Sequence, residues 1–148
     1  MKILFVFALF LLTSSMHVSA EPPLVDPPDL RNIQFPEGQP PVDGDFQPTG
    51  EMLSNLEEAA GLLRMAKNMS VNVTGSTDSK ECAAAECVAL GMRRAKFVYD
   101  WLDRHGVERR RLGKISSTGS DSAIASNTTD DRRFNRRVEF EILSESSN

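Results

Sequence analysis

The sequence predicts an α+β fold in which a small mixed sheet packs one of its faces against two helices. Segments with helical periodicity alternate with short segments in which apolar and polar residues alternate, and the predicted order is β-α-β-α-β-β. The length limits the chain to one domain, because 148 residues leave no room for a second substantial core. All eight prolines lie between Pro22 and Pro48, and this change in composition marks a boundary within the chain.

The first two elements follow the proline-rich part of the chain. A short strand is expected at residues 33–35, where Pro36 closes it. A helix is expected over residues 51–67, because apolar residues recur there at helical spacing, and Thr49 is its predicted cap. Its buried stripe is expected to consist of Leu53, Leu56, Ala60 and Leu63.

A second strand and a longer helix come next. The strand is expected at residues 70–74, where valines alternate with polar residues. After a loop to about Glu81, the helix is expected to end before Gly106, which suits a left-handed cap. Its buried stripe is expected to consist of Val88, Met92, Ala95, Tyr99 and Leu102. Methionine is a flexible filler of cores, so Met92 and Met65 are both expected inside.

The last part of the chain predicts two more strands. The first is expected at residues 112–117, followed by a loop at 119–129 and one helical turn at 130–134. The final strand begins near Val138, where apolar residues alternate with two glutamates. We therefore expect one face of this strand to contact water.

The first 20 residues have the pattern of a secretory signal peptide. Lys2 is followed by ten apolar residues, and Val18-Ser19-Ala20 supplies a small-residue cleavage site. Ten helical residues rise about 15 Å, roughly half the hydrocarbon thickness, so no transmembrane anchor is expected in the mature chain. The predicted organisation is a signal peptide at 1–20, a Pro-rich flexible leader at 21–31, a folded domain at 32–143 and a polar tail at 144–148.

Composition excludes several classes of function. The formal net charge is −4 and falls by one when Lys2 is removed, so general binding of nucleic acid is not expected. After cleavage only His105 and two cysteines remain, which excludes a four-ligand zinc site of His and Cys. A histidine-based triad would need His105 itself, at a helix end. We therefore predict no metal, no cofactor and no catalytic residue. A secreted hydrolase is an alternative, but the sequence contains no motif typical of a catalytic nucleophile.

Four short motifs in order carry a family resemblance. They are Gly75–Asp78 at the end of a strand, Leu90–Val98 on a helix, Thr118–Asn127 in a loop and Asn135–Glu139 opening the last strand. Together they resemble the OmpA-like C-terminal domain, which reads roughly V-x-G-H-T-D, L-S-x-x-R-A-x-x-V, G-x-G-E…P-x-A-S-N and N-R-R-V-E. The resemblance covers about residues 32–143 and implies the same α+β fold. It also implies peptidoglycan binding in the periplasm of a Gram-negative bacterium, in association with the cell wall or outer membrane.

The resemblance also implies a set of ligand-binding residues. The family binds diaminopimelate, which presents an ammonium and a carboxylate from one centre. By this likeness Asp78 takes the ammonium and Arg94 the carboxylate, since a planar guanidinium donates two parallel hydrogen bonds. Arg137 would line the same pocket, and Thr77 and Leu90 would shape it. If both residues bind one zwitterionic centre, neither is expected to be needed for folding. Without the family pattern, Asp78 reads as a loop or cap carboxylate and Arg94 as part of a solvated helix face.

The sequence departs from the family pattern in the loop that follows Asp78. Ser76 stands where the family has His or Tyr, Glu81 stands where it has Gly, and one extra residue separates Asp78 from Arg94. Two functions therefore stay open. One is a peptidoglycan-binding module, whose Pro-rich leader serves either to dock another envelope protein or as a spacer. The other is a protein-interaction or regulatory module that kept the fold and lost wall binding.

Both cysteines lie in this same loop. Export to an oxidising compartment favours a disulfide between Cys82 and Cys87. Within one continuous helix, residues 82 and 87 would rise about 7.5 Å apart, which exceeds the roughly 7 Å that a disulfide can span. The predicted disulfide therefore requires Cys82 to lie in the loop and the helix to begin after it.

Overall fold

The computed structural model describes residues 29–126, 128 and 130–144. The predicted signal peptide, most of the predicted leader and the end of the tail lie outside these residues. The described elements are β1 (Ile33–Gln34), α1 (Gly50–Met65), β2 (Met69–Ser76), α2 (Ala84–Arg104), η1 (Arg109–Arg111), β3 (Leu112–Gly119), η2 (Arg132–Asn135) and β4 (Arg137–Ser144). The predicted α+β class and strand and helix order are confirmed. The helical turn predicted at 130–134 is the 3-10 helix η2.

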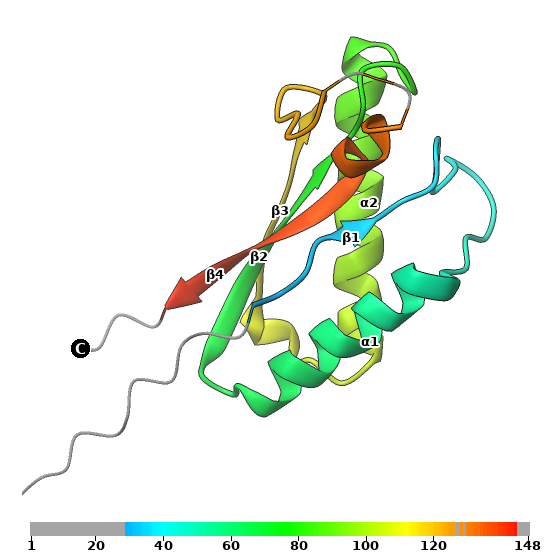
Figure 1. Cartoon of the computed structure of the whole chain (residues 1–148). Coiled ribbons are helices and arrows are strands. Elements are labelled where there is room, and N and C mark those ends of the chain that lie inside the picture. The colour runs from blue at the N-terminus through cyan, green and yellow to red at the C-terminus, as the bar shows by residue number, and fades with distance from the viewer. Residues whose placement is uncertain (1–28, 127, 129, 145–148) are drawn as a thin grey trace, which may run out of the picture.

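The four strands form one mixed sheet in the order β1-β4-β2-β3. Strands β2 and β3 are parallel and are joined through α2, whereas β4 returns antiparallel between β2 and β1. Both helices lie on one side of this sheet, as predicted, and the short β1 lies beside β4 at its edge (Figure 1). The carboxyl end of β2, the start of α2 and the start of β4 therefore meet at one end of the domain.

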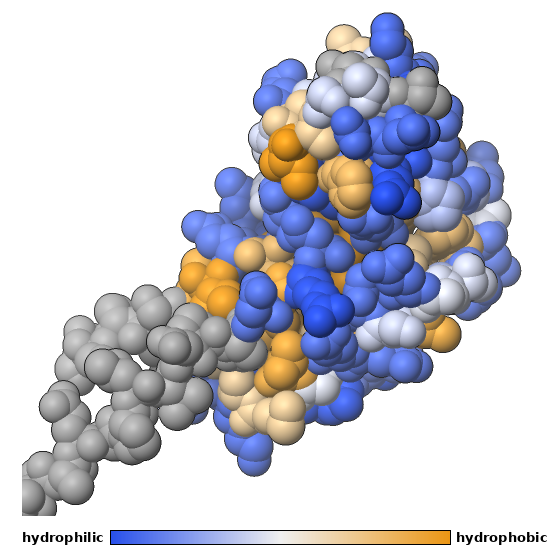
Figure 2. All heavy atoms as spheres, viewed as in Figure 1, coloured by the Kyte–Doolittle hydropathy of each residue, from blue (hydrophilic) through white to orange (hydrophobic). Residues whose placement is uncertain are grey.

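The core lies between the sheet and the two helices. Val71 and Val73 of β2 and Val138 of β4 are fully buried on the helix side. On the face seen in Figure 2, hydrophilic residues predominate and hydrophobic residues are scattered among them. Leu30, near the end of the segment predicted to be a leader, also packs into the core. The folded unit thus begins slightly earlier than the proline pattern indicates.

Three residues expected inside are exposed instead. Val88 and Met92 of the predicted α2 stripe are 48% and 40% exposed, and Met65, expected as core filler, is 75% exposed. The other stripe members are buried or half-buried. In the first half of α2 the buried residues are instead Cys87, Leu90, Gly91 and Arg94. Further along the helix the predicted positions Ala95, Tyr99 and Leu102 are buried as expected.

Two glycines set this approach. A Cβ added to Gly75 in β2 would lie 1.9 Å from the carbonyl oxygen of Gly91 in α2. A Cβ added to Gly91 would lie 2.2 Å from the Ser117 hydroxyl oxygen. Contacts this short exclude any side chain at either position. The amino-terminal half of α2 is therefore held close to the ends of β2 and β3.

A buried arginine closes the opposite end of the domain. Arg111 is 4% exposed and donates hydrogen bonds to the carbonyl oxygens of Leu63, Ala66 and Met69. These bonds tie the end of α1 to the start of β2. Gly106 has φ +87°, so the predicted left-handed cap of α2 is confirmed. The structure places Thr49 at the amino-terminal cap of α1, but its side chain makes no capping hydrogen bond.

Candidate functional site

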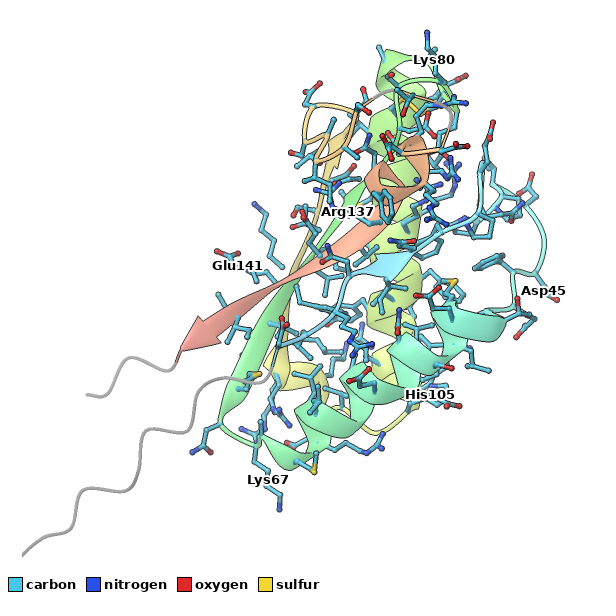
Figure 3. The ribbon with its side chains drawn as sticks, in the orientation of Figure 1. Asp45, Lys67, Lys80, His105, Arg137 and Glu141 are labelled. Carbon is cyan, nitrogen blue, oxygen red and sulfur yellow. A yellow bond between two sulfur atoms is a disulfide. The ribbon has the colours of Figure 1, made fainter. Side chains whose placement is uncertain are left out.

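The candidate site lies where β2 ends and the loop to α2 begins. Strand β2 runs two residues further than predicted, and Ser76, Thr77 and Asp78 are each no more than 1% exposed. The loop that follows is marked by Lys80 at one extremity of the molecule in Figure 3. The contact of Gly75 with Gly91 holds α2 against this strand end, which brings the two motifs containing Asp78 and Arg94 together.

Asp78 is a buried carboxylate enclosed by donors. Its Oδ1 accepts the backbone N–H groups of Lys80 and Glu81 at 2.7 and 3.1 Å. Its Oδ2 lies 3.0 Å from Arg136 Nη1, and Arg132 Nη1 is 3.8 Å from Oδ1. Burial by itself raises the pKa of Asp78, but the Lys80 N–H and the two guanidinium groups outweigh it and hold the pKa below its usual value.

Arg94 is a buried guanidinium with every donor used. Its side chain has no exposure, and Nη1 and Nη2 donate to the two carboxylate oxygens of Glu81 at 2.6 and 2.7 Å. The remaining N–H groups donate to the carbonyl oxygens of Ser76, Gln39 and Pro36. These five bonds satisfy all five N–H donors of arginine. The reading of Arg94 as a solvated helix residue is therefore wrong.

Glu81 is the central residue that sequence reasoning missed. Besides Arg94, its carboxylate accepts the backbone N–H groups of Asp78 at 3.0 Å and Gly38 at 2.9 Å. Asp78 in turn accepts the N–H of Glu81, so the two residues form the reciprocal pattern of a capping box. The signal was present in the sequence as Asp-x-x-Glu. The family pattern, which has glycine at this position, does not indicate this role.

The structure does not bring Arg137 to this cluster. Val138 pairs with Gly75, and both face α2, so the pleat turns Arg137 to the opposite face of the sheet. There its guanidinium contacts the Glu139 carboxylate and the Ser122 carbonyl oxygen. Arg137 is labelled in Figure 3. The preceding residue, Arg136, occupies the position expected for Arg137 and contacts Asp78. A one-residue shift changes the face, which the motif alone does not specify.

Thr77 and Leu90 lie at the same end of the domain as Asp78. Thr77 donates its backbone N–H to the Gly119 carbonyl oxygen, and Leu90 lies on α2 one turn before Arg94 with 3% exposure. Within the part of the chain that the structure describes, two buried side-chain atoms have no hydrogen-bond partner, namely Thr77 Oγ1 and Arg137 Nη1.

Asn135, the first residue of the Asn-Arg-Arg motif, has a structural role. It is fully buried, and its side-chain oxygen accepts the backbone N–H groups of Ile124 and Ala125. Its side-chain amide donates to the carbonyl oxygen of Ala125. These bonds fix the loop after β3 to η2, and so position Arg132 and Arg136 around Asp78.

The predicted disulfide is present. Cys82 and Cys87 are bonded with a Cα–Cα distance of 5.1 Å. Helix α2 begins at Ala84, so Cys82 lies in the loop, as the reach of a disulfide required. The bond ties the residue after Glu81 to the first turns of α2.

A separate hollow lies away from this cluster. It has a volume of about 470 Å³ and is bounded by residues 44–48, α1 and the end of α2. The rings of Trp101 and His105, which line it, are stacked with their centroids 3.5 Å apart, and Asp45 lines it as well. Asp45 and His105 are labelled in Figure 3. None of the predicted site residues lines the hollow. Among the described residues, no helix is long and apolar enough to span a membrane.

Comparison with known proteins agrees with the geometry. The C-terminal domain of MotB from Helicobacter pylori has a TM-score of 0.65 at 24% identity, covering 80% of this chain and 88% of that chain. The peptidoglycan-associated lipoprotein from Burkholderia pseudomallei has a TM-score of 0.61 at 22% identity, covering 76% and 90%. At these identities the two structures show the fold. No curated protein sequence matches the chain.

The family follows from a sequence model. The model of the OmpA family matches residues 45–137, which is more than half of the chain. This range contains the strand end with Asp78, the helix with Arg94, and the loop and arginines that surround them. The chain therefore belongs to the OmpA family.

Proposed function

We propose that this domain is a non-catalytic module that binds peptidoglycan through the diaminopimelate of the stem peptide. Membership of the OmpA family supports this, as does the structural likeness to a peptidoglycan-associated lipoprotein. The site consists of carboxylates and guanidinium groups, which suit reversible ionic recognition. A ligand with an ammonium and a carboxylate on one centre needs one group of each sign at fixed separation.

The observation that carries the proposal is the position of Asp78 and Arg94. Both are buried at one end of the domain, and Glu81 contacts the backbone N–H of the first and the guanidinium of the second through one oxygen. Asp78 lies behind Arg132 and Arg136, whose side chains are 20% and 15% exposed and so reach the surface. In the proposed mode, the ligand ammonium replaces these arginines at Asp78, and the ligand carboxylate replaces Glu81 at Arg94.

Sedimentation with purified, insoluble peptidoglycan tests this proposal. We expect the wild-type domain in the pellet and Asp78→Asn in the supernatant, because the amide keeps the shape and loses the charge. Arg94→Lys should retain only part of the binding, since an ammonium cannot form the bidentate contact. Arg93→Ala is the matched control, because Arg93 directly precedes Arg94 on α2 and its Nε donates a hydrogen bond to the Pro40 carbonyl oxygen rather than to Glu81. Equal sedimentation of all four proteins would contradict the assigned site.

One observation favours the second candidate, an interaction module that has lost wall binding. Glu81 fills both bonding positions of Arg94, and neither side chain is exposed. If this contact is permanent, no external carboxylate reaches the arginine. Wild-type protein that stays in the supernatant at every peptidoglycan concentration would support this candidate against the first.

The proposed location is the periplasm, reached through a cleaved signal peptide at residues 1–20. Peptidoglycan lies in that compartment, and an oxidising compartment is where a disulfide such as Cys82–Cys87 persists. Amino-terminal sequencing of the secreted protein should begin at Glu21; a sequence that retains Met1 would contradict cleavage. We further propose that the Pro-rich segment 21–31 docks another envelope protein or acts as a spacer.

A further inference from the structure

We propose that Glu81 is a built-in carboxylate ligand of Arg94, held in place by the Cys82–Cys87 disulfide, and that reduction of this bond by a dithiol opens Arg94 to an external carboxylate. The inference rests on the proposed function in one respect: Arg94 is the residue proposed to bind the ligand carboxylate. It adds a regulatory state to that site.

The contact between Glu81 and Arg94 has the geometry of ligand recognition. Two parallel N–H···O bonds of 2.6 and 2.7 Å join the planar groups, which is the arrangement a guanidinium makes with a bound carboxylate. The other three N–H groups of Arg94 are held by backbone carbonyl oxygens. When Glu81 leaves, those three bonds keep the guanidinium in place. The two N–H groups that it releases then point at the position where a carboxylate can dock.

The disulfide restricts the segment that carries Glu81. Cys82 follows Glu81 directly, and Cys87 is 2% exposed on α2, so the bond fixes the end of the loop to the helix. Closing a short loop removes conformations that the free chain would otherwise visit. The Glu81 carboxylate is also held by the N–H groups of Asp78 and Gly38. Opening the disulfide removes the covalent one of these restraints, so that positions of Glu81 away from Arg94 become populated.

The chemical step is a thiol–disulfide exchange. Cys82 is partly exposed whereas Cys87 is buried, so the reductant's thiolate attacks the Cys82 sulfur. A mixed disulfide forms, and Cys87 leaves as a thiolate that takes up a proton. The second thiol of the reductant then attacks its own half of the mixed disulfide. The products are two cysteine thiols in the domain and one disulfide in the reductant.

Chemical modification of arginine by phenylglyoxal, mapped by peptide mass spectrometry, tests the closed state directly. In the oxidised wild-type domain we expect Arg94 to be protected. After dithiothreitol treatment, and in the Cys82→Ser/Cys87→Ser double variant, we expect its modification rate to rise at least tenfold. Glu81→Gln should raise the rate whether or not the disulfide is intact, because the amide lacks the charge and one of the two acceptors.

Arg111 is the internal control in every sample. It is a buried arginine at the other end of the domain and is bonded only to backbone carbonyl oxygens among the residues described. It should stay protected throughout. Protection of Arg94 in the reduced protein would overturn the inference. So would equal rise in the modification of Arg94 and Arg111, because that pattern means loss of the fold rather than opening of one site.

Peptidoglycan sedimentation of the same samples separates this inference from the proposed function. We expect reduction to lower the Kd by about tenfold or more, which corresponds to at least 1.4 kcal/mol. If Arg94 opens on reduction but the protein never sediments, the disulfide control stands and the proposed function is wrong. If the oxidised and reduced proteins sediment equally while Arg94 stays protected, the function stands and the disulfide control is wrong.

Discussion

Replacing Arg94 by Met should destabilise the fold severely, because it leaves the Glu81 carboxylate buried without its counter-charge. Both side chains have no exposure, so the charge of Glu81 cannot be screened by water in the native state. Two backbone N–H groups remain as its partners, from Asp78 and Gly38. These dipoles replace only part of the interaction with a full positive charge.

The magnitude follows from the burial of the pair. Removing one partner of a buried ion pair costs about 3–5 kcal/mol. For a domain of this size, each kcal/mol lowers the Tm by about 4 °C, so a decrease of about 12–20 °C is expected. An exposed pair on the same helix gives the comparison. Lys96 and Asp100 are 2.5 Å apart with side chains 65% and 40% exposed, and Lys96→Met should cost only about 0.3–0.5 kcal/mol.

Urea unfolding of Arg94→Met, Glu81→Gln and the double variant measures this coupling. The double variant removes both charges, and the oxygen of its neutral amide can still accept one of the two backbone N–H groups. We therefore expect it to be more stable than Arg94→Met alone, with a coupling free energy of about 1–3 kcal/mol. If Arg94→Met loses no more stability than Lys96→Met, the argument from a buried ion pair is wrong.

Three further predictions concern the rest of the domain. Because the pKa of Asp78 is lowered in the folded state, its contribution to the free energy of unfolding is complete above pH ~4 and is lost as the pH falls through the lowered pKa. Urea unfolding at a series of pH values should show that the difference in free energy of unfolding between wild type and Asp78→Asn shrinks in that range. Gly91→Ala should lower the Tm, because its Cβ would lie 2.2 Å from the Ser117 hydroxyl oxygen. Gly61→Ala on α1 is the control: its Cβ would have its nearest neighbour at 3.9 Å, and thermal unfolding should show a stability gain of about 0.4–1 kcal/mol. Asn135→Ala removes three hydrogen bonds to residues 124 and 125 and should speed hydrogen exchange at their amides; unchanged exchange would contradict the role given to Asn135.

The sequence alone determined the framework of the domain. Periodicity placed the two helices, the strand at 70–74 and the final strand, because the spacing of apolar residues reports which face of an element is buried. With the strands expected at 33–35 and 112–117, the predicted order agrees with the structure. The reach of a disulfide limited where α2 could begin, and the helix starts at Ala84, after Cys82. The motifs around Asp78 and Arg94 identified the family, which the match over residues 45–137 then showed.

Only the tertiary structure decided what those two residues contact. Arg94 is held by carbonyl oxygens of Pro36 and Gln39, 58 and 55 residues away in sequence, and no local pattern predicts such a contact. The pleat of β4 decided that Arg136 rather than its neighbour contacts Asp78. Packing of α2 through glycine decided which side of the helix faces the sheet. Charged side chains take their partners from whichever elements the fold brings within bonding distance, and that distance is set by three-dimensional packing rather than by spacing along the chain.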